Sequence, residues 1–171
     1  MNILITGKPG VGKTSLVQKI LAKVKLKPQG FFTREIRSDE RSRVGFEIVT
    51  FDGTTVLLAH SEKLTPYRLG KYFVNVENIN RFIVPSIETV VKDSELIIID
   101  EIGKMELLSS LFKQAVLKAL NSTKPVIGTI TLAELPFVKE VKARPDVILL
   151  KLNQNNRKEI YQIIIDLLTE K

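Results

Sequence analysis

Residues 7–14 form a glycine-rich segment that strongly limits what this 171-residue chain can fold into. The segment follows a short apolar run, Ile3–Ile5, and precedes an amphipathic helical pattern that starts near Lys13. Its letters, GKPGVGKT, match the phosphate-binding pattern G-x-x-x-x-G-K-[ST], which requires a buried strand before it and a helix after it. Glycines let backbone N–H groups approach phosphate oxygens, and the helix N-terminus attracts anions. The sequence therefore predicts a site for a nucleoside triphosphate.

Each residue of this loop has an expected role. We expect the Lys13 ammonium to reach the β- and γ-phosphates and the Thr14 hydroxyl to ligate Mg²⁺. The expected nucleotide-binding residues are Gly7, Lys8, Pro9, Gly10, Val11, Gly12, Lys13, Thr14 and Ser15, together with Asn156 and Arg157 further along the chain.

Strand and helix patterns alternate over most of the remaining sequence. Strands are expected over residues 2–6, 96–99, 126–130 and 147–152, and helices over about 13–25, 107–120, 133–142 and 160–168. Such alternation predicts a mainly parallel sheet with helices on both faces, in an α/β fold of three layers. At this length a single domain over residues 1–171 is expected.

The segment of about residues 30–60 departs from that alternation. Phe31–Arg37, Val44–Phe51 and Thr54–His60 have strand patterns, and the turn dipeptide Asp52-Gly53 joins the last two. Three successive strands without a helix between them predict an antiparallel strand insertion beside the main sheet. Residues 61–76 are the hardest to assign, although Tyr72–Val74 fits a short strand. The apolar positions from Val76 to Ile83 then indicate a helix, and Pro85 fits the first turn of a second helix that ends near Lys92.

Two adjacent carboxylates follow the apolar run Leu96–Ile99. Asp100 stands at the end of a buried strand, where a carboxylate supports Mg²⁺, and the ligand-binding edge of a parallel sheet brings it beside Thr14. Glu101 can hold a water in line with the γ-phosphate and accept its proton. The alternative is that Glu101 only places a negative charge at the N-terminus of the next helix.

A positive group must also meet the charge that develops on the transferred phosphoryl group. We expect Lys104 and Arg37 to serve, so that the predicted catalytic residues are Lys13, Glu101, Lys104 and Arg37, with Thr14 and Asp100 as metal ligands. Other candidate cations are Lys8, Arg34, Arg41 and Arg43, although for each arginine a solvated surface position is the alternative.

Base recognition is weakly specified. The guanine-reading pattern N-K-x-D is absent, and Asn156-Arg157 follows the last expected strand, where it could contact the base. The alternative is that these residues simply begin a helix. We therefore expect loose selectivity among ATP, GTP and other triphosphates.

Composition excludes several other functions. The chain has no cysteine and one histidine, His60, which rules out thiol catalysis and a histidine metal cluster. The net charge of +7 is spread along the chain and aromatic residues total 6%, so nucleic acid is possible but not indicated as a partner. No apolar run reaches the length of a membrane span, and no secretory signal precedes the first strand, so a cytoplasmic location is expected. The oligomeric state is not predicted.

Several stretches together resemble one family of P-loop nucleoside-triphosphatases, which includes the cancer-related human enzyme and its thermophilic bacterial and archaeal relatives. They are the glycine loop, Gly30–Arg37 with Val44–Phe46 after it, Gly70–Glu77, Ile99–Leu107 and, less distinctively, Asn156-Arg157. The run Ile99–Leu107, IDEIGKMEL, is the most distinctive of them. The resemblance implies a P-loop NTPase fold and slow, Mg²⁺-dependent hydrolysis of ATP, GTP and other triphosphates.

In one place the sequence departs from what we expect of such a site. Thr131–Leu135, after the strand that ends at Ile130, contains no arginine or lysine that could sense the γ-phosphate. The missing cation must then come from Lys104, Arg37 or Arg144.

Three functions remain open at this stage. The first is a hydrolase in which Glu101 activates water. The second is a kinase that transfers the γ-phosphate to a nucleotide, a nucleoside or an RNA end, with residues 30–76 forming the acceptor site or a lid. The third is a nucleotide-dependent switch or binding module.

Overall fold

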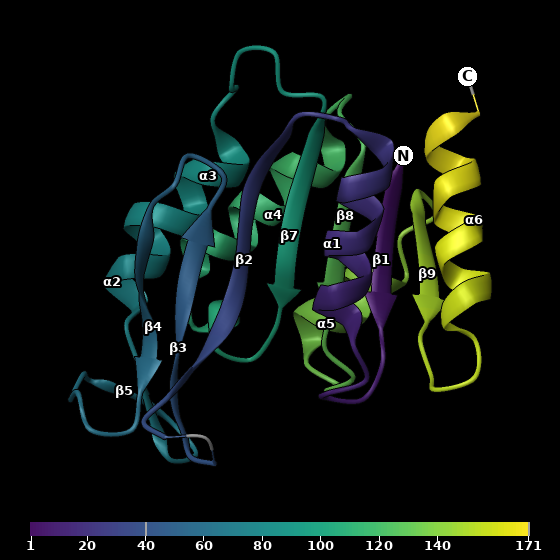
Figure 1. Cartoon of the computed structure of the whole chain (residues 1–171). Coiled ribbons are helices and arrows are strands. Elements are labelled where there is room, and N and C mark those ends of the chain that lie inside the picture. Colours follow the sequence, from purple (N-terminus) through teal and green to yellow (C-terminus); the bar gives the residue numbers. More distant parts are fainter. Residues whose placement is uncertain (40, 171) are drawn as a thin grey trace.

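The computed structural model describes residues 1–39 and 41–170, and it places the strands of this part of the chain in one sheet (Figure 1). The strand order is β5-β6-β4-β3-β2-β7-β8-β1-β9. The strands are β1 (Asn2–Thr6), β2 (Pro28–Arg37), β3 (Arg43–Thr50), β4 (Thr55–His60), β5 (Tyr67–Leu69), β6 (Tyr72–Val74), β7 (Leu96–Ile102), β8 (Val126–Ile130) and β9 (Val147–Lys151). Strands β2, β7, β8, β1 and β9 run parallel. The sequence predicts this for β7, β8, β1 and β9, whereas it assigns β2 to the antiparallel insertion.

Helices cover both faces of the sheet. They are α1 (Lys13–Val24), α2 (Val76–Asn78), η1 (Ile79–Ile83), α3 (Val84–Glu88), η2 (Glu106–Leu108), α4 (Ser110–Asn121), α5 (Pro136–Lys142) and α6 (Arg157–Thr169). In Figure 1, α1 crosses in front of the parallel strands and α4 lies behind them. No helix among the described residues is both long and apolar enough to cross a membrane.

Neighbouring residues of a strand enter different cores, because side chains alternate between the two faces of a sheet. In β7, Ile98 packs in the core that α1 and α6 cover, whereas Ile97 and Ile99 pack in the core that α3 and α4 cover. In β1, Leu4 packs in the core that α3 and α4 cover, and its neighbour Ile5 packs in the core that α1 and α6 cover. The expected three-layer α/β fold is thereby confirmed.

The antiparallel part of the sheet lies on one side of β2. Strands β2, β3 and β4 pair antiparallel in sequence, and β6 and β5 extend the pairing beyond β4. The predicted insertion is confirmed, and it continues to Val74 rather than ending near residue 60. The first residues of β2, Pro28–Phe31, also pair in parallel with β7, so the insertion begins on a strand of the main sheet.

Two local features near the carboxyl ends of the parallel strands position the site. The helix expected from residue 133 begins only at Pro136, because proline fits the first turn of a helix and the preceding residues form a turn. The pairing of β7 with β8 also slips: Ile99 is opposite Gly128, whereas Ile102 is opposite Ile130. Strand β7 therefore carries one residue more than β8 over this interval.

Candidate active site

The glycine-rich loop leaves β1 and enters α1 at Lys13, as the sequence predicts. Gly12 precedes the helix with φ = 100°, a left-handed conformation that glycine adopts without strain. A Cβ at this position would lie 2.6 Å from Nη1 of Arg157. Gly12 has no side chain to cap the helix, so N–H groups of the first turn remain available to an anion. The left-handed backbone conformation therefore favours glycine here, and a Cβ would also force the Arg157 side chain to move.

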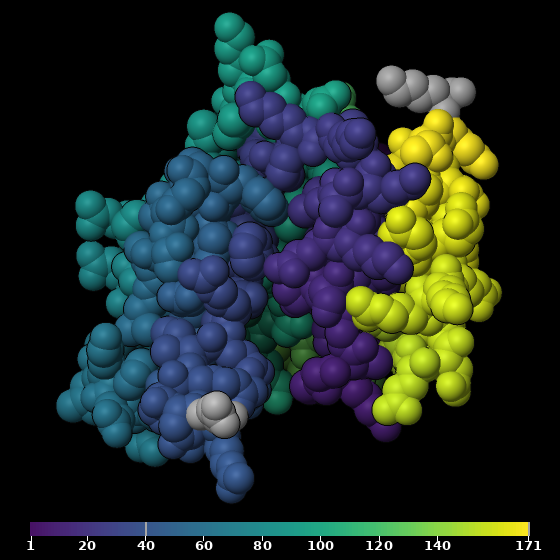
Figure 2. All heavy atoms as spheres, in the orientation of Figure 1, coloured from purple at the N-terminus to yellow at the C-terminus, as the bar shows by residue number. Residues whose placement is uncertain are grey.

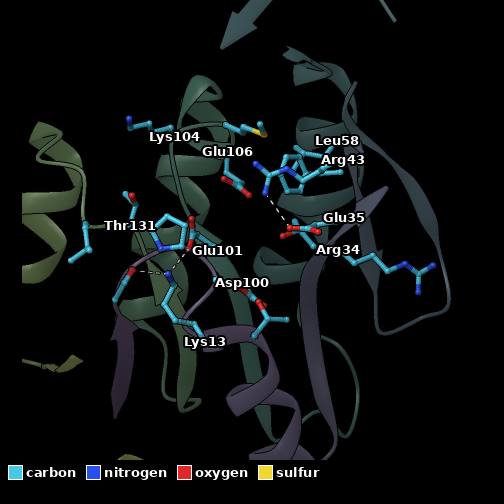
Figure 3. A pocket seen from close by; sticks show the side chains of 18 of the residues that line it. Lys13, Arg34, Glu35, Arg43, Leu58, Asp100, Glu101, Lys104, Glu106 and Thr131 are labelled. Atoms are coloured by element: carbon cyan, nitrogen blue, oxygen red, sulfur yellow. Dashed lines mark hydrogen bonds and ion pairs between the residues drawn. The ribbon is translucent and has the colours of Figure 1, made fainter. Parts of the chain in front are cut away.

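Lys13 links this loop to the end of β7. Its Nζ donates to the Gly7 carbonyl at 2.8 Å and lies 3.9 Å from Oε2 of Glu101 (Figure 3). The Lys13 side chain is only 10% exposed. The ammonium therefore sits between the loop predicted to hold the phosphates and the carboxylate predicted to activate the nucleophile.

Asp100 is buried at the end of β7, and one of its oxygens has a clear partner. The Thr129 hydroxyl on β8 donates to Oδ1 at 2.6 Å. Oδ2 is buried and receives no hydrogen bond from the described residues. Burial raises the pKa of Asp100, while the hydroxyls of Thr129 and Thr14 and the charge of Lys13 oppose that rise. A buried carboxylate oxygen without a partner, close to the Thr14 hydroxyl, has the chemistry of a site for a hard cation.

Glu101 and Glu106 bring two more carboxyl groups to the same place. A Cβ at Gly103 would lie 2.7 Å from Oε1 of Glu101 and 3.0 Å from Oε2 of Glu106, so both groups pack around this glycine. Burial raises the pKa of Glu101, with the Lys13 ammonium opposing the rise. Burial and the negative charge of Glu101 raise the pKa of Glu106 well above its usual value. Glu106 is therefore protonated over a wider pH range than an exposed glutamate.

Sequence reasoning missed Glu106. It lies in η2, a turn too short to have a helical period, and only its position within the run Ile99–Leu107 could have drawn attention to it. Glu106 is one of several charged residues in this run, and nothing in the sequence indicates that its side chain is only 5% exposed.

The loop and the carboxylates open into one cavity of about 1040 Å³. Figure 2 shows it as a hollow between the blue strands of the antiparallel segment and the purple N-terminal segment. Many of the predicted site residues line it: Gly7, Pro9, Gly10, Gly12, Lys13, Thr14, Ser15, Asp100, Glu101 and Lys104. The opposite wall comes from β2, β3, β4 and the β5–β6 hairpin, whose contribution the sequence predicted only as a general acceptor region or lid.

The candidate cations divide between the cavity and the surface. Lys104, Arg34 and Arg43 line the cavity, although Arg34 pairs with Glu47 and points away from the carboxylates in Figure 3. Arg37 pairs with Glu35 at 2.5 Å and does not line the cavity. The structure therefore does not bring Arg37 to the predicted site.

Two further candidates also lie elsewhere. Arg41 is absent from the cavity lining. Arg144 hydrogen-bonds to Asp146 just before β9, at the end of the parallel strands opposite the glycine loop. A cation that sequence reasoning did not consider, Lys142 on α5, donates to the Thr131 carbonyl at 2.8 Å. It lies behind the stretch that lacks basic residues, and burial lowers its pKa.

The other face of the loop meets the segment that follows β9. Lys8, Pro9, Gly10 and Val11 line a second cavity of about 440 Å³ together with residues 151–155. Arg157 donates from Nη1 to the Gly12 carbonyl at 2.9 Å, which joins α6 to the loop. Asn156 instead organises its own turn, accepting from the Asn153 N–H and donating to the Lys151 carbonyl. Contact of Asn156 and Arg157 with a base stays a prediction.

A glycine loop and strand-end carboxylates at one edge of a parallel sheet are the arrangement of P-loop NTPases. The chain belongs to the NTPase family, whose model matches residues 2–165. It is 45% identical over 168 residues to nucleoside-triphosphatase THEP1 of Thermotoga maritima, an alignment that covers 98% of this chain and 95% of the relative. It is also 35% identical over 180 residues to the cancer-related nucleoside-triphosphatase homolog of Mus musculus, covering 96% of this chain and 94% of the relative.

Solved structures agree with this assignment. The crystal structure of THEP1 from Aquifex aeolicus superposes with a TM-score of 0.88 at 35% identity, covering 99% of this chain and 100% of the other. The solution structure of a human cancer-related nucleoside triphosphatase gives a TM-score of 0.83 at 32% identity, with 99% of each chain covered. The expected family and the P-loop fold are confirmed.

Proposed function

We propose that this chain hydrolyses nucleoside triphosphates, ATP and GTP among them, to the diphosphate and phosphate with the help of Mg²⁺. The observation that carries the proposal is the position of Glu101, in the same cavity as the glycine loop and 3.9 Å from the Lys13 ammonium. The names of the relatives, which describe nucleoside-triphosphatases, support the same reaction.

In this proposal the triphosphate lies along the loop. Backbone N–H groups of the glycine-rich loop, Pro9 excepted, and of the first turn of α1 bind its phosphate oxygens. Lys13, which already lies at the loop, exchanges its bond to the Gly7 carbonyl for the β- and γ-phosphates. Lys104, exposed at the cavity wall, is the candidate to meet the charge on the γ-phosphoryl group.

The residues present fit Mg²⁺. The ion prefers oxygen ligands and is commonly held by one or two protein groups plus substrate phosphates. Asp100 Oδ2 and the Thr14 hydroxyl would hold it, directly or through water. When bound, the ion neutralises charge on the β- and γ-phosphate oxygens.

Glu101 performs the proton transfer. A water oxygen attacks the γ-phosphorus, and the bond from phosphorus to the β–γ bridging oxygen breaks. The carboxylate of Glu101 accepts the water proton, and the diphosphate leaves with the bridging oxygen. The raised pKa of Glu106, which also packs against Gly103, favours its neutral form and so limits the negative charge beside this base.

Loose base selectivity follows from the second cavity. The nucleoside would leave the loop on the side lined by residues 151–155, where Asn153, Gln154 and Asn155 offer amide groups on an exposed turn. Amides both donate and accept hydrogen bonds, so such a wall can serve several bases.

The test is the variant Glu101→Gln, which keeps the size of the side chain and removes the base. We expect kcat to fall by at least about 100-fold, in the range assigned to general bases, with the Kd for a non-hydrolysable ATP analogue within about threefold of wild type. Glu140→Gln, an exposed change on α5, is the matched control and keeps full activity. Normal turnover by Glu101→Gln would show that another group activates water.

A further inference from the structure

The main cavity is larger than its share of the nucleotide requires. Ligand pockets usually measure about 300–1,000 Å³ for a whole drug-sized ligand, whereas this cavity measures about 1040 Å³. The second cavity, on the other side of the loop, offers about 440 Å³ for the nucleoside half. With the base and sugar there, only the end of the triphosphate enters the main cavity. Most of the space beyond Glu101 is then left for something else.

That space has an apolar and aromatic wall supplied by the antiparallel part of the sheet. We call it the acceptor compartment and define it by Arg43, Phe46, Leu58, Leu69, Tyr72 and Met105, which all line the cavity. The rings of Phe46 and Tyr72 meet edge to face, with centroids 5.3 Å apart. Arg43 lies over the Phe46 ring at 5.0 Å. Hydrolysis uses water and releases phosphate, and neither of these polar molecules requires an apolar, aromatic wall beside the site.

The charges of the compartment disfavour an anionic occupant. Nε of Arg43 donates to the Tyr72 hydroxyl at 2.9 Å, and Nη1 donates to Glu35 at 3.1 Å (Figure 3). The other arginine of this wall, Arg34, pairs with Glu47 outside the cavity. Both arginines therefore have carboxylate partners, and a phosphate group on the occupant would have to displace them. A flat, uncharged ring can instead pack on the Arg43 guanidinium where it covers Phe46, without breaking either ion pair. Stacking of a base on a side-chain platform is worth about 1–3 kcal/mol, with a cation–π contribution from arginine.

We propose that the acceptor compartment binds an uncharged nucleoside and that the chain transfers the γ-phosphate to one of its hydroxyl groups. The base packs against Arg43 and Phe46, which Tyr72 supports from behind, and the sugar extends toward Glu101. The proposal rests on the proposed function, because the same loop and the same Glu101 act in both reactions.

The transfer balances without a further reactant. The nucleoside hydroxyl oxygen forms a bond to the γ-phosphorus, and the bond from phosphorus to the β–γ bridging oxygen breaks. Glu101 accepts the hydroxyl proton. The products are a nucleoside monophosphate and the nucleoside diphosphate of the donor. With the compartment empty, water takes the place of the hydroxyl, and hydrolysis results.

The experiment uses the full chain with γ-labelled ATP, Mg²⁺ and, separately, adenosine, guanosine, cytidine, uridine or thymidine. We expect label in the monophosphate of at least one nucleoside, formed faster than free phosphate. The variant Phe46→Leu should lower the ratio of monophosphate to free phosphate at least tenfold. The matched control is Tyr67→Leu, which likewise replaces an aromatic ring by leucine, at a 45% exposed tyrosine outside the cavity, and it should leave that ratio as in wild type.

The wild-type measurement decides the matter even if a variant fails to fold. No labelled monophosphate from any of the five nucleosides overturns the proposal. Label transferred to nucleoside monophosphates, supplied in parallel, but not to nucleosides also overturns it, because the acceptor would then be charged. Neither result affects hydrolysis by Glu101. Conversely, if Glu101→Gln hydrolyses normally while wild type phosphorylates a nucleoside, the base assignment fails and the compartment stands.

Discussion

The hydrogen bond from Arg157 to the Gly12 carbonyl ties the C-terminal helix to the phosphate loop, and its removal should weaken nucleotide binding. Hydrogen bonds to charged groups contribute about 1.5–3 kcal/mol. This one, at 2.9 Å, is only partly buried, and exposed charged contacts contribute at most about 1 kcal/mol, so we assign it about 1–2 kcal/mol. The nucleotide must restore the loop conformation when this bond is absent, so that free energy is lost from binding. At about 1.4 kcal/mol per factor of ten, Arg157→Ala should raise the Kd by about 5- to 30-fold.

The assay is calorimetric titration of the full chain with a non-hydrolysable ATP analogue in the presence of Mg²⁺. The matched control is Lys158→Ala, which removes the same charge from the next, exposed position of α6. Thermal unfolding of both variants checks that the fold is intact. If Arg157→Ala binds within twofold of Lys158→Ala, the contact does not hold the loop, and the reasoning from its geometry is wrong.

Three further predictions concern charge, catalysis and packing. Burial raises the pKa of Glu106 in the folded chain, so wild type loses stability as pH rises from the unfolded pKa of about 4.3 toward the raised value. Glu106→Gln should therefore gain stability over wild type across that window in urea unfolding at pH 4 to 8, and a pH-independent difference would contradict this. Lys104→Ala should lower kcat by about 100- to 1,000-fold with little change in nucleotide Kd. Arg37→Ala, a change outside the cavity, should alter kcat less than threefold. Equal losses of kcat in the two variants would contradict the assignment of Lys104, because a position in the cavity would then not decide which cation acts. Phe112→Ala should lower the free energy of unfolding by about 3–5 kcal/mol, because Phe112 is fully buried and packs edge-on against Phe31. Urea unfolding measures this loss, and a loss below about 1 kcal/mol would contradict that packing.

The predictable parts of the fold and site were those with local signals. The glycine loop has a fixed spacing between a strand and a helix, and Leu96–Ile99 is an uninterrupted apolar run that a buried parallel strand requires. Both segments are therefore where the sequence placed them. The same apolar run predicted where Asp100 lies, because Asp100 is the first polar residue after the run.

The parts that could not be predicted depend on contacts between distant segments. Strand β5 pairs with β6 at the edge of the sheet and is three residues long, which is too short for residues 67–69 to show a period of their own. Arg37 and Arg43 are both basic residues near one turn, yet Arg43 lines the cavity and Arg37 does not. Their different positions depend on the pairing of β2 with β3, whose register shifts beside Arg37. The burial of Glu106 likewise depends on how η2 packs, which no local pattern records.

The slip in pairing between β7 and β8 has a consequence for how the Asp100-Glu101 pair could be transferred to another protein. In a regular strand, neighbouring side chains face opposite sides of the sheet, yet Asp100 and Glu101 line one cavity. The extra residue of β7 lies in the interval that contains this pair. Grafting Asp-Glu onto a regular strand of another scaffold would therefore point one carboxylate into the wrong layer. A designer who borrows this chemistry has to transplant the irregularity together with the two acids.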